Sequence, residues 1–238
     1  MAEPSFEFRA PPFTRAMRVV AVVLGVIWLV TVLLQGAGLG GFTGPLGFFE
    51  PLALVPESVV RRGFAWQLVT HALLHDPGGF VSLLFTVLAL WFMGSPLEAR
   101  WGARRVLGLM AGATLVGGAC AVGAGFVSAA IFRGAVVSPA AAVSALLAAW
   151  CALHAKERVS FLGLATLSGG QMLGLMAGVV LLQFAWTRDG TGVASLAGFP
   201  VGYLYASRTA GPRGGVRAQR QSGPHLRVIR GGGSDLPN

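Results

Sequence analysis

Long stretches without a charged side chain constrain this chain more than any other feature. Six windows contain no Asp, Glu, Lys or Arg: residues 19–49, 77–97, 106–132, 134–155, 159–187 and 190–207. Each can supply about 18–25 mainly apolar residues, enough for a helix to cross roughly 30 Å of hydrocarbon. Only 11% of the 238 residues are charged and 54% are hydrophobic, which excludes an ordinary soluble domain and a disordered chain. The sequence therefore predicts an all-α membrane protein with six spans.

The charge-free windows and their flanks also predict the domain organisation. We expect a short N-terminal arm over residues 1–17, a six-span domain over 18–207 and a disordered basic tail over 208–238. The predicted spans are 18–35, 78–96, 106–131, 136–154, 170–187 and 191–207. The longest connection, residues 36–76, is rich in glycine, proline and aromatic residues, and its Trp66 is typical of a membrane interface. We expect this connection to be a part-buried interfacial loop.

The placement of basic residues predicts the orientation. With six spans and a cytoplasmic N-terminus, 14 basic residues lie on the cytoplasmic side and four on the opposite side: Arg61, Arg62, Arg133 and Arg188. Cytoplasmic loops of membrane proteins carry the excess of Lys and Arg. Both termini are therefore expected in the cytoplasm. Arg outnumbers Lys 17 to 1, a composition typical of GC-rich bacteria, so we expect a multi-pass protein of the bacterial inner membrane.

The net charge of +9 does not by itself indicate nucleic-acid binding. Much of it lies in the tail after Ser207, where a solvated segment beside anionic lipid is the simpler interpretation. Apart from Arg18 at the very start of the first, no charged residue lies inside a predicted span, which argues against an ion path, a proton relay or a coupled transporter. His71 and His75 are four residues apart but lack a third metal ligand. We expect no nucleic acid, metal or cofactor, and the oligomeric state stays open.

Small residues line one face of the sixth predicted span. Gly198, Gly202 and Ala206 follow one another at intervals of four residues. Helices in lipid associate through close backbone approach, because lipid supplies little hydrophobic driving force between them. We therefore expect this span to pack tightly in the centre of the bundle. The pairs at positions 108 and 112, and at 174 and 178, repeat this glycine spacing in the third and fifth spans.

Three stretches together resemble the rhomboid family of intramembrane serine proteases. Residues 66–75 are WQLVTHALLH, which is similar to the family's approach to its second span. Residues 94–102 are GSPLEARWG, similar to the turn after that span, and residues 198–205 are GFPVGYLY, similar to the small-residue face of the sixth. The resemblance implies a six-helix rhomboid-like bundle over residues 18–207. From their position at the end of the second span we expect Glu98 and Arg100 to cap and pair at the cytoplasmic surface, and the resemblance implies that Glu98 helps to fix the following turn.

The residues that this family uses for catalysis are replaced in this chain. The family's serine nucleophile, in a Gly-x-Ser-Gly setting near the start of span four, aligns with Ala140, and its histidine base on span six aligns with Ser195. The His and Asn that help to hold the oxyanion align with Ser82 and Thr86. A methyl group cannot attack a carbonyl, and a serine hydroxyl cannot accept a proton near neutral pH as imidazole does. The resemblance therefore implies a pseudoprotease.

The same alignment predicts that the shape of the site survives. Ser82, Ala140 and Ser195 each lie four to five residues inside a predicted span, which corresponds to a depth of roughly 6–9 Å. Together with Thr86 and Ser144 they are expected to line a small polar pocket just below the outer membrane surface. The predicted function is binding of membrane-spanning helices of client proteins beside spans two and five. The expected partners are those helices and membrane lipids.

Two other functions stay open. A diverged intramembrane serine endopeptidase would use Ser138 or Ser144 as a relocated nucleophile, with His75 as its base. A small permease or channel would need a water-lined path through the whole bundle. We treat the protease as the main alternative, because the three matching stretches belong to a protease family.

Overall fold

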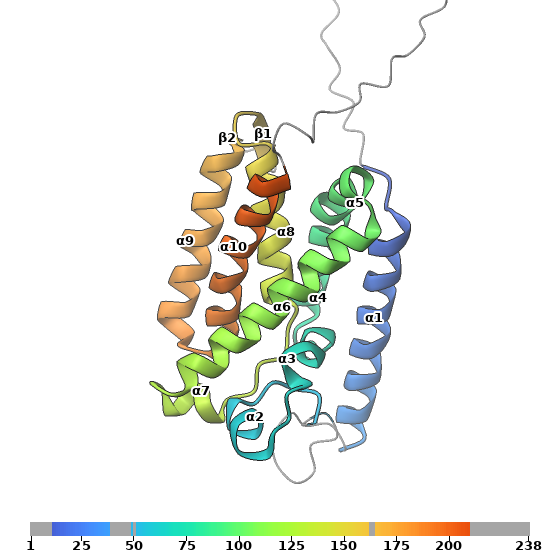
Figure 1. Ribbon diagram of the computed structural model, residues 1–238. Helices are drawn as coiled ribbons and strands as arrows, with labels where there is room; N and C mark the ends of the chain where they lie inside the picture. Colours follow the sequence, from blue (N-terminus) through green and yellow to red (C-terminus); the bar gives the residue numbers. More distant parts are fainter. Residues whose placement is uncertain (1–10, 39–48, 50, 162–164, 210–238) are drawn as a thin grey trace, which may run out of the picture.

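The chain is mostly helical in the part that the structure, a computed structural model, describes: residues 11–38, 49, 51–161 and 165–209 (Figure 1). The helices are α1 (Arg15–Gly36), α2 (Pro56–Arg62), α3 (Gln67–Thr70), the 3₁₀ turn η1 (His71–Leu73), α4 (Phe80–Ala89), the π-helical η2 (Leu90–Gly94), α5 (Ser95–Trp101), α6 (Ala103–Gly125), α7 (Ala129–Arg133), α8 (Ala140–Leu153), α9 (Gly169–Thr187) and α10 (Gly190–Thr209). An antiparallel hairpin of β1 (Arg158–Phe161) and β2 (Ala165–Ser168) joins α8 to α9. The expected tail over 208–238 lies outside the described residues from 210 onward.

Four helical segments of the described chain are long and apolar enough to cross a membrane. They are Arg15–Gly36, Phe80–Trp101, Ala103–Gly125 and Gly169–Thr187, and the second of them combines α4, η2 and α5. The helix α8 is apolar but has only 14 residues. The helix α10 has 20 residues and is rich in glycine and alanine. It contacts α6, α8 and α9, so other helices rather than lipid surround much of its surface.

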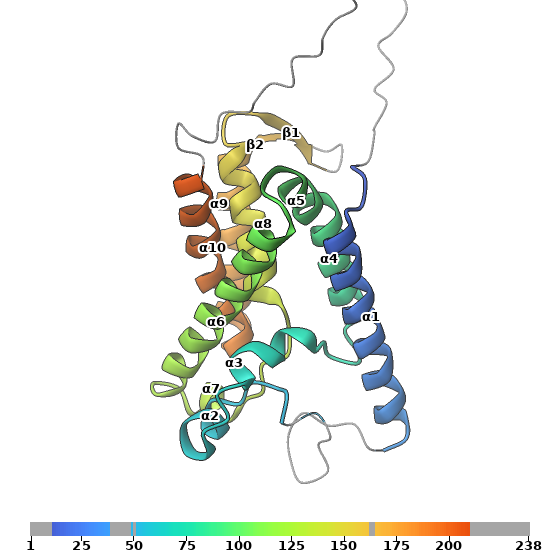
Figure 2. The same ribbon diagram turned by 45° about the vertical axis from the view of Figure 1, so that its right-hand side comes forward.

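The two ends of the bundle differ in charge and in structure (Figures 1 and 2). At the basic end lie the start of α1, the junction of α5 and α6, the β hairpin and the end of α10. Its basic residues include Arg15, Arg18, Arg100, Arg104, Arg105, Lys156 and Arg208. At the opposite loop end lie α2, α3, α7 and the turn between α9 and α10. The described chain thus begins and ends at the same end of the bundle.

The small-residue stripe of α10 lies against the backbone of α8. A Cβ atom added at Gly198 would overlap the carbonyl oxygen of Ala141, and one added at Gly202 would overlap the carbonyl oxygen of Ala145. Ala206, one turn further, is completely buried. These contacts allow the two helix backbones to touch, which increases dispersion contact where the hydrophobic effect is weak. They also fix the register of α10 against α8.

The other two glycine pairs behave differently. A Cβ atom added at Gly108, Gly112, Gly174 or Gly178 would meet nothing within 4 Å. The spacing of four in α6 and α9 therefore does not mark a helix contact among the described residues. Spacing shows that small residues share a face, but it does not show whether another helix covers that face.

Several predicted boundaries need correction. The span predicted over 106–131 ends at Gly125, and Ser128 then caps the separate short helix α7 by accepting a hydrogen bond from the Ile131 amide (3.4 Å). The span predicted over 136–154 begins only at Ala140, because Val136 exchanges two backbone hydrogen bonds with Leu54 (2.8 and 3.1 Å). The β hairpin between α8 and α9 was not predicted. The expected interfacial loop contains α2, α3 and η1 in its described part.

Candidate functional site: a polar cavity between α4, α8, α9 and α10

A cavity of about 490 Å³ lies where α4, α8, α9 and α10 meet. Its polar lining residues are Ser82, Thr86, Ser138, Ser144, Gln183, Thr191 and Ser195, and Ala140 lines it as well. Six of these eight were singled out from the sequence, and they come from three segments that are far apart in the chain. The structure therefore brings the predicted positions of spans two, four and six together around one space.

The depths of these residues differ from the sequence estimate. Ser82 is the third residue of α4, and Ala140 is the first residue of α8, because residues 136–139 are not helical. Only Ser195 lies five residues beyond the start of its helix. Ser82 is exposed, whereas Thr86, Ser144 and Ser195 are at most 9% exposed. The polar groups therefore extend from the mouth of the cavity to its buried wall.

Sequence analysis missed two polar residues of the cavity, Gln183 on α9 and Thr191 on α10. Thr191 precedes Ser195 by four residues, so both lie on one face of α10. That spacing was available in the sequence. Gln183 lies in the charge-free window 159–187 without a motif around it, and only the packing of α9 against α8 and α10 places it at the cavity.

Close packing of three helices sets the relative position of Ala140 and Ser195. A Cβ atom added at Gly117 of α6 would lie 2.5 Å from the Ala141 Cβ and 3.1 Å from the Ala194 carbonyl oxygen. The neighbours of Ala140 and Ser195 therefore meet at one glycine of α6. At the cavity wall this arrangement presents the methyl group of Ala140 and the hydroxyl group of Ser195. Neither group can act as the base that a serine nucleophile requires.

His75 contacts the cavity indirectly, through Thr86. The His75 side chain is 1% exposed, and its Nε2 lies 3.3 Å from the Thr86 Oγ1. Burial lowers the pKa of His75 from 6.5 to about 4, so the ring is neutral at physiological pH. Its Nδ1 has no hydrogen-bond partner in the described structure. The side chain of His75 is hydrogen-bonded to Thr86. Among the described residues, no hydrogen bond joins His75 to Ser138 or Ser144.

His71 lies in the same segment and has a different environment. Its Nδ1 lies 2.8 Å from the Gln67 carbonyl oxygen, and the ring is 1% exposed. Burial is the larger effect on its pKa and lowers it, while the bond to Gln67 opposes that shift. Within the described residues, no three His, Cys, Asp or Glu side chains gather closely enough to bind a metal ion.

Glu98 caps α1 rather than pairing with Arg100. Its carboxylate accepts hydrogen bonds from the Thr14 hydroxyl (2.5 Å) and from the backbone amides of Ala16 (3.2 Å) and Met17 (3.1 Å). The first amides of a helix lack partners within the helix and carry a partial positive charge, so a carboxylate is a favourable cap. Arg100 is exposed and forms no ion pair with Glu98. The expected pairing with Arg100 is thus replaced by a link between α5 and α1.

Comparison with known proteins agrees with the motifs. The family model described as Rhomboid domain matches residues 62–211, well over half of the chain. No curated protein gives a significant match. The matched range includes every residue of the polar cavity, together with His75 and Glu98. With the four long apolar helices, the match supports a multi-pass membrane protein and confirms the resemblance. The chain therefore belongs to the rhomboid family.

Proposed function

We propose that this rhomboid-family protein binds membrane-spanning helices of client proteins at the cavity between α4 and α9 and does not cleave them. The observation that carries the proposal is a cavity of about 490 Å³ with polar walls and, at the two catalytic positions of the family, Ala140 and Ser195. Hydrolysis by this family needs a nucleophile and a base, and the loss of both removes most of the rate enhancement of such sites.

The walls of the cavity fit a helix that arrives from the side. On α4, Val81 is 61% exposed and Phe85 is 66% exposed, and both line the cavity next to Ser82. On α9, Leu182 is 73% exposed beside the cavity residue Gln183. Apolar side chains at the rim suit contact with lipid or with a client helix. Hydroxyl and amide groups behind them offer hydrogen bonds to a locally unwound or polar part of the client.

The proposed topology has six membrane-crossing helices, with α8 and α10 as the two inner ones. Both described ends of the chain lie at the basic end of the bundle (Figure 1), and the excess of basic residues there supports a cytoplasmic position for that end. The polar cavity then faces the outer leaflet. Contact between Gly202 and the Ala145 backbone closes the interface of α8 and α10 toward the basic end, which argues against a channel.

The alternative of a diverged protease has one observation in its favour, since Ser138 and Ser144 both line the cavity. It lacks a base, because the hydrogen bond that the structure gives His75 goes to Thr86. Serine hydrolysis requires a base within about 2.6–3.2 Å of the nucleophile. We therefore propose a non-catalytic function.

Site-directed photo-crosslinking in native membranes tests the proposal. A photoreactive residue at position 85, at the rim of the cavity, is expected to crosslink to membrane-spanning proteins whose length is unchanged. The matched control is position 116 on α6, where Val116 is exposed to 43% but lies away from the cavity. Equal crosslinking at both positions would contradict a specific client site. Recovery of cleaved clients at position 85 would favour the protease.

A further inference from the structure

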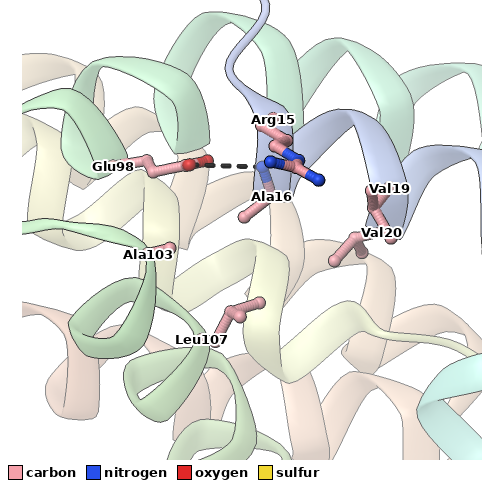
Figure 3. A pocket seen from close by; sticks show the side chains of 7 residues that line it. All are labelled: Arg15, Ala16, Val19, Val20, Glu98, Ala103 and Leu107. Atoms are coloured by element: carbon pink, nitrogen blue, oxygen red, sulfur yellow. Dashed lines mark hydrogen bonds between the residues drawn. The ribbon is translucent and has the colours of Figure 1, made fainter.

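A second, apolar groove lies on the other flank of the bundle, between α1 and α6. It consists of two adjoining cavities that share Val20. The first, of about 310 Å³, lies at the basic end and is lined by Arg15, Val19, Glu98 and Leu107 among others (Figure 3). The second, of about 180 Å³, continues deeper, past Leu24 and Met110 to α3 and α8. Neither contains a residue of the polar cavity.

The side chains of the groove suit a hydrocarbon chain. Figure 3 shows Val19 and Val20 on α1 facing the space, with Leu107 on α6 at its other side. Val19 is 55% exposed and Leu107 is 39% exposed, so the groove is open to the surroundings of the bundle. Leu24 is 2% exposed and forms part of the deeper wall. Away from the basic end the lining is almost wholly apolar.

The mouth of the groove carries an uncompensated positive charge. Arg15 is exposed, and no carboxylate of the described chain forms an ion pair with it. The one acidic residue of the mouth, Glu98, already accepts three hydrogen bonds from the start of α1. An anionic group at this position would meet the guanidinium group of Arg15.

The lining of the groove suits a lipid chain. The deeper cavity, of about 180 Å³, is lined almost wholly by apolar side chains, whereas the polar cavity has many hydroxyl and amide groups in its wall. A thin apolar chain with a charged head matches a narrow apolar groove with a basic mouth. Membrane leaflets with anionic lipids attract basic residues near their surface. The positive charge at the mouth is therefore complementary to the negative charge of such lipids.

We propose that this groove holds one anionic phospholipid, with its phosphate at Arg15 and one acyl chain between α1 and α6. The lipid fills the space between the two helices and is a structural partner distinct from the clients of the polar cavity. The binding does not depend on the proposed client function, because no residue is shared between the two sites.

Native mass spectrometry of the full chain tests this proposal. The protein is reconstituted in vesicles of equal parts phosphatidylglycerol and phosphatidylcholine, extracted in mild detergent, and examined for retained lipid. We expect one retained lipid, mainly phosphatidylglycerol. Leu107→Trp, at a partly exposed position of the groove, is expected to lower retention at least fivefold. Arg15→Gln is expected to lower the preference for the anionic lipid about fivefold, the effect of one basic residue at an anionic surface.

Two control variants match these substitutions. Val116→Trp adds the same bulk to an exposed position of α6 outside the groove, and Arg105→Gln removes the same charge from a neighbouring exposed position. Both are expected to retain lipid as the unmodified chain does. The proposal is overturned if no lipid is retained, if the two Trp variants retain equal amounts, or if the two Gln variants show equal preference. Thermal unfolding of each variant verifies that it is folded. If Leu107→Trp does not fold, the comparison of Arg15→Gln with Arg105→Gln decides whether the proposal stands.

Discussion

Ala140 and Ser195 face one cavity from the first two turns of α8 and α10. The residues that would complete a hydrolytic pair are missing, whereas the backbone contacts that hold the two positions together are present, such as that of Gly198 with Ala141. Close backbone packing thus holds together two positions whose side chains, a methyl group and a hydroxyl group, offer no base. Helix packing that forms the cavity without a nucleophile and base in it supports a site that binds a partner and does not cleave it.

Restoring the two catalytic groups tests whether the geometry persists. In the double variant Ala140→Ser and Ser195→His, we expect the serine Oγ and a ring nitrogen to come within about 2.6–3.2 Å of each other. A structure of the variant in lipid measures this distance directly. Separation of the two groups beyond hydrogen-bond reach would show that positions 140 and 195 are not the equivalents of the family's catalytic pair.

The buried ring of His75 predicts a pH dependence of stability. Its pKa is about 4 in the folded chain and 6.5 without burial, so below pH 6.5 the unfolded chain binds a proton that the folded chain does not. The free energy of unfolding should therefore fall as the pH decreases from 6.5 to about 4, by at most about 1.4 kcal/mol per pH unit. Unfolding in detergent over this range measures it. His75→Gln should make the slope smaller and leave the part that comes from His71, whose pKa burial also lowers, whereas His154→Gln should leave the slope unchanged; equal slopes in both variants would refute the assignment.

Between elements, two kinds of contact hold the bundle. The helix α10 lies on α8 through glycine, and α1 is attached to α5 through Glu98. A further close contact supports α1, because a Cβ atom added at Gly94 would lie 2.6 Å from the Met17 Sδ. The contact of α10 with α8 depends on glycines that leave no side chain between the two backbones, so a larger residue there weakens it. The contact of α1 with α5 depends on hydrogen bonds to Glu98, so loss of that carboxylate weakens it.

A methyl group at the interface of α10 and α8 should be costly. Gly202→Ala places a Cβ against the Ala145 backbone carbonyl, which cannot move without shifting α8, and we expect a loss of about 1–3 kcal/mol in the free energy of unfolding. Gly174→Ala is the matched control, because nothing lies within 4 Å of its added Cβ. It should be neutral or stabilising by about 0.5–1 kcal/mol. Equal effects of the two substitutions in unfolding titrations would contradict the packing described.

Removal of the Glu98 carboxylate should loosen α1. Glu98→Ala leaves the Thr14 hydroxyl and two backbone amides without an acceptor, at an expected cost of about 1–3 kcal/mol. The control Arg100→Ala, an exposed position without an ion pair to Glu98, should change stability by less than about 0.5 kcal/mol. Proteolysis at the start of α1, followed over time, reports the local effect. A similar rate in both variants would argue against the cap.

The sequence predicted the helical segments better than their ends. Absence of charge is a local property, so residues 18–35 and 170–187 were predicted close to their observed bounds. The start of α8 depends on pairing of Val136 with Leu54, which are 82 positions apart, and no local pattern reports such a contact. The cavity residues Ser82, Thr86, Ala140 and Ser195 were found through the family motifs. Thr191 and Gln183 were not, and the place of Gln183 at the cavity comes from the packing of α9.

At the scale of the whole molecule, the bundle has two different lateral faces. The face between α4 and α9 carries the polar cavity, and the face between α1 and α6 carries the apolar groove with a basic mouth. Both open beside helices that are long and apolar enough to cross a membrane. The two proposed sites share no lining residue, so we expect that binding of a client helix and binding of a lipid do not compete.

The absence of a reactive serine is the central claim, and labelling with a fluorophosphonate probe tests it most directly. The protein in lipid is incubated with the probe, next to the double variant Ala140→Ser and Ser195→His as the positive control. We predict no labelling of the unmodified chain and measurable labelling of the variant at position 140. Labelling of the unmodified chain at Ser138 or Ser144, lost when that serine is changed to alanine, would contradict the account.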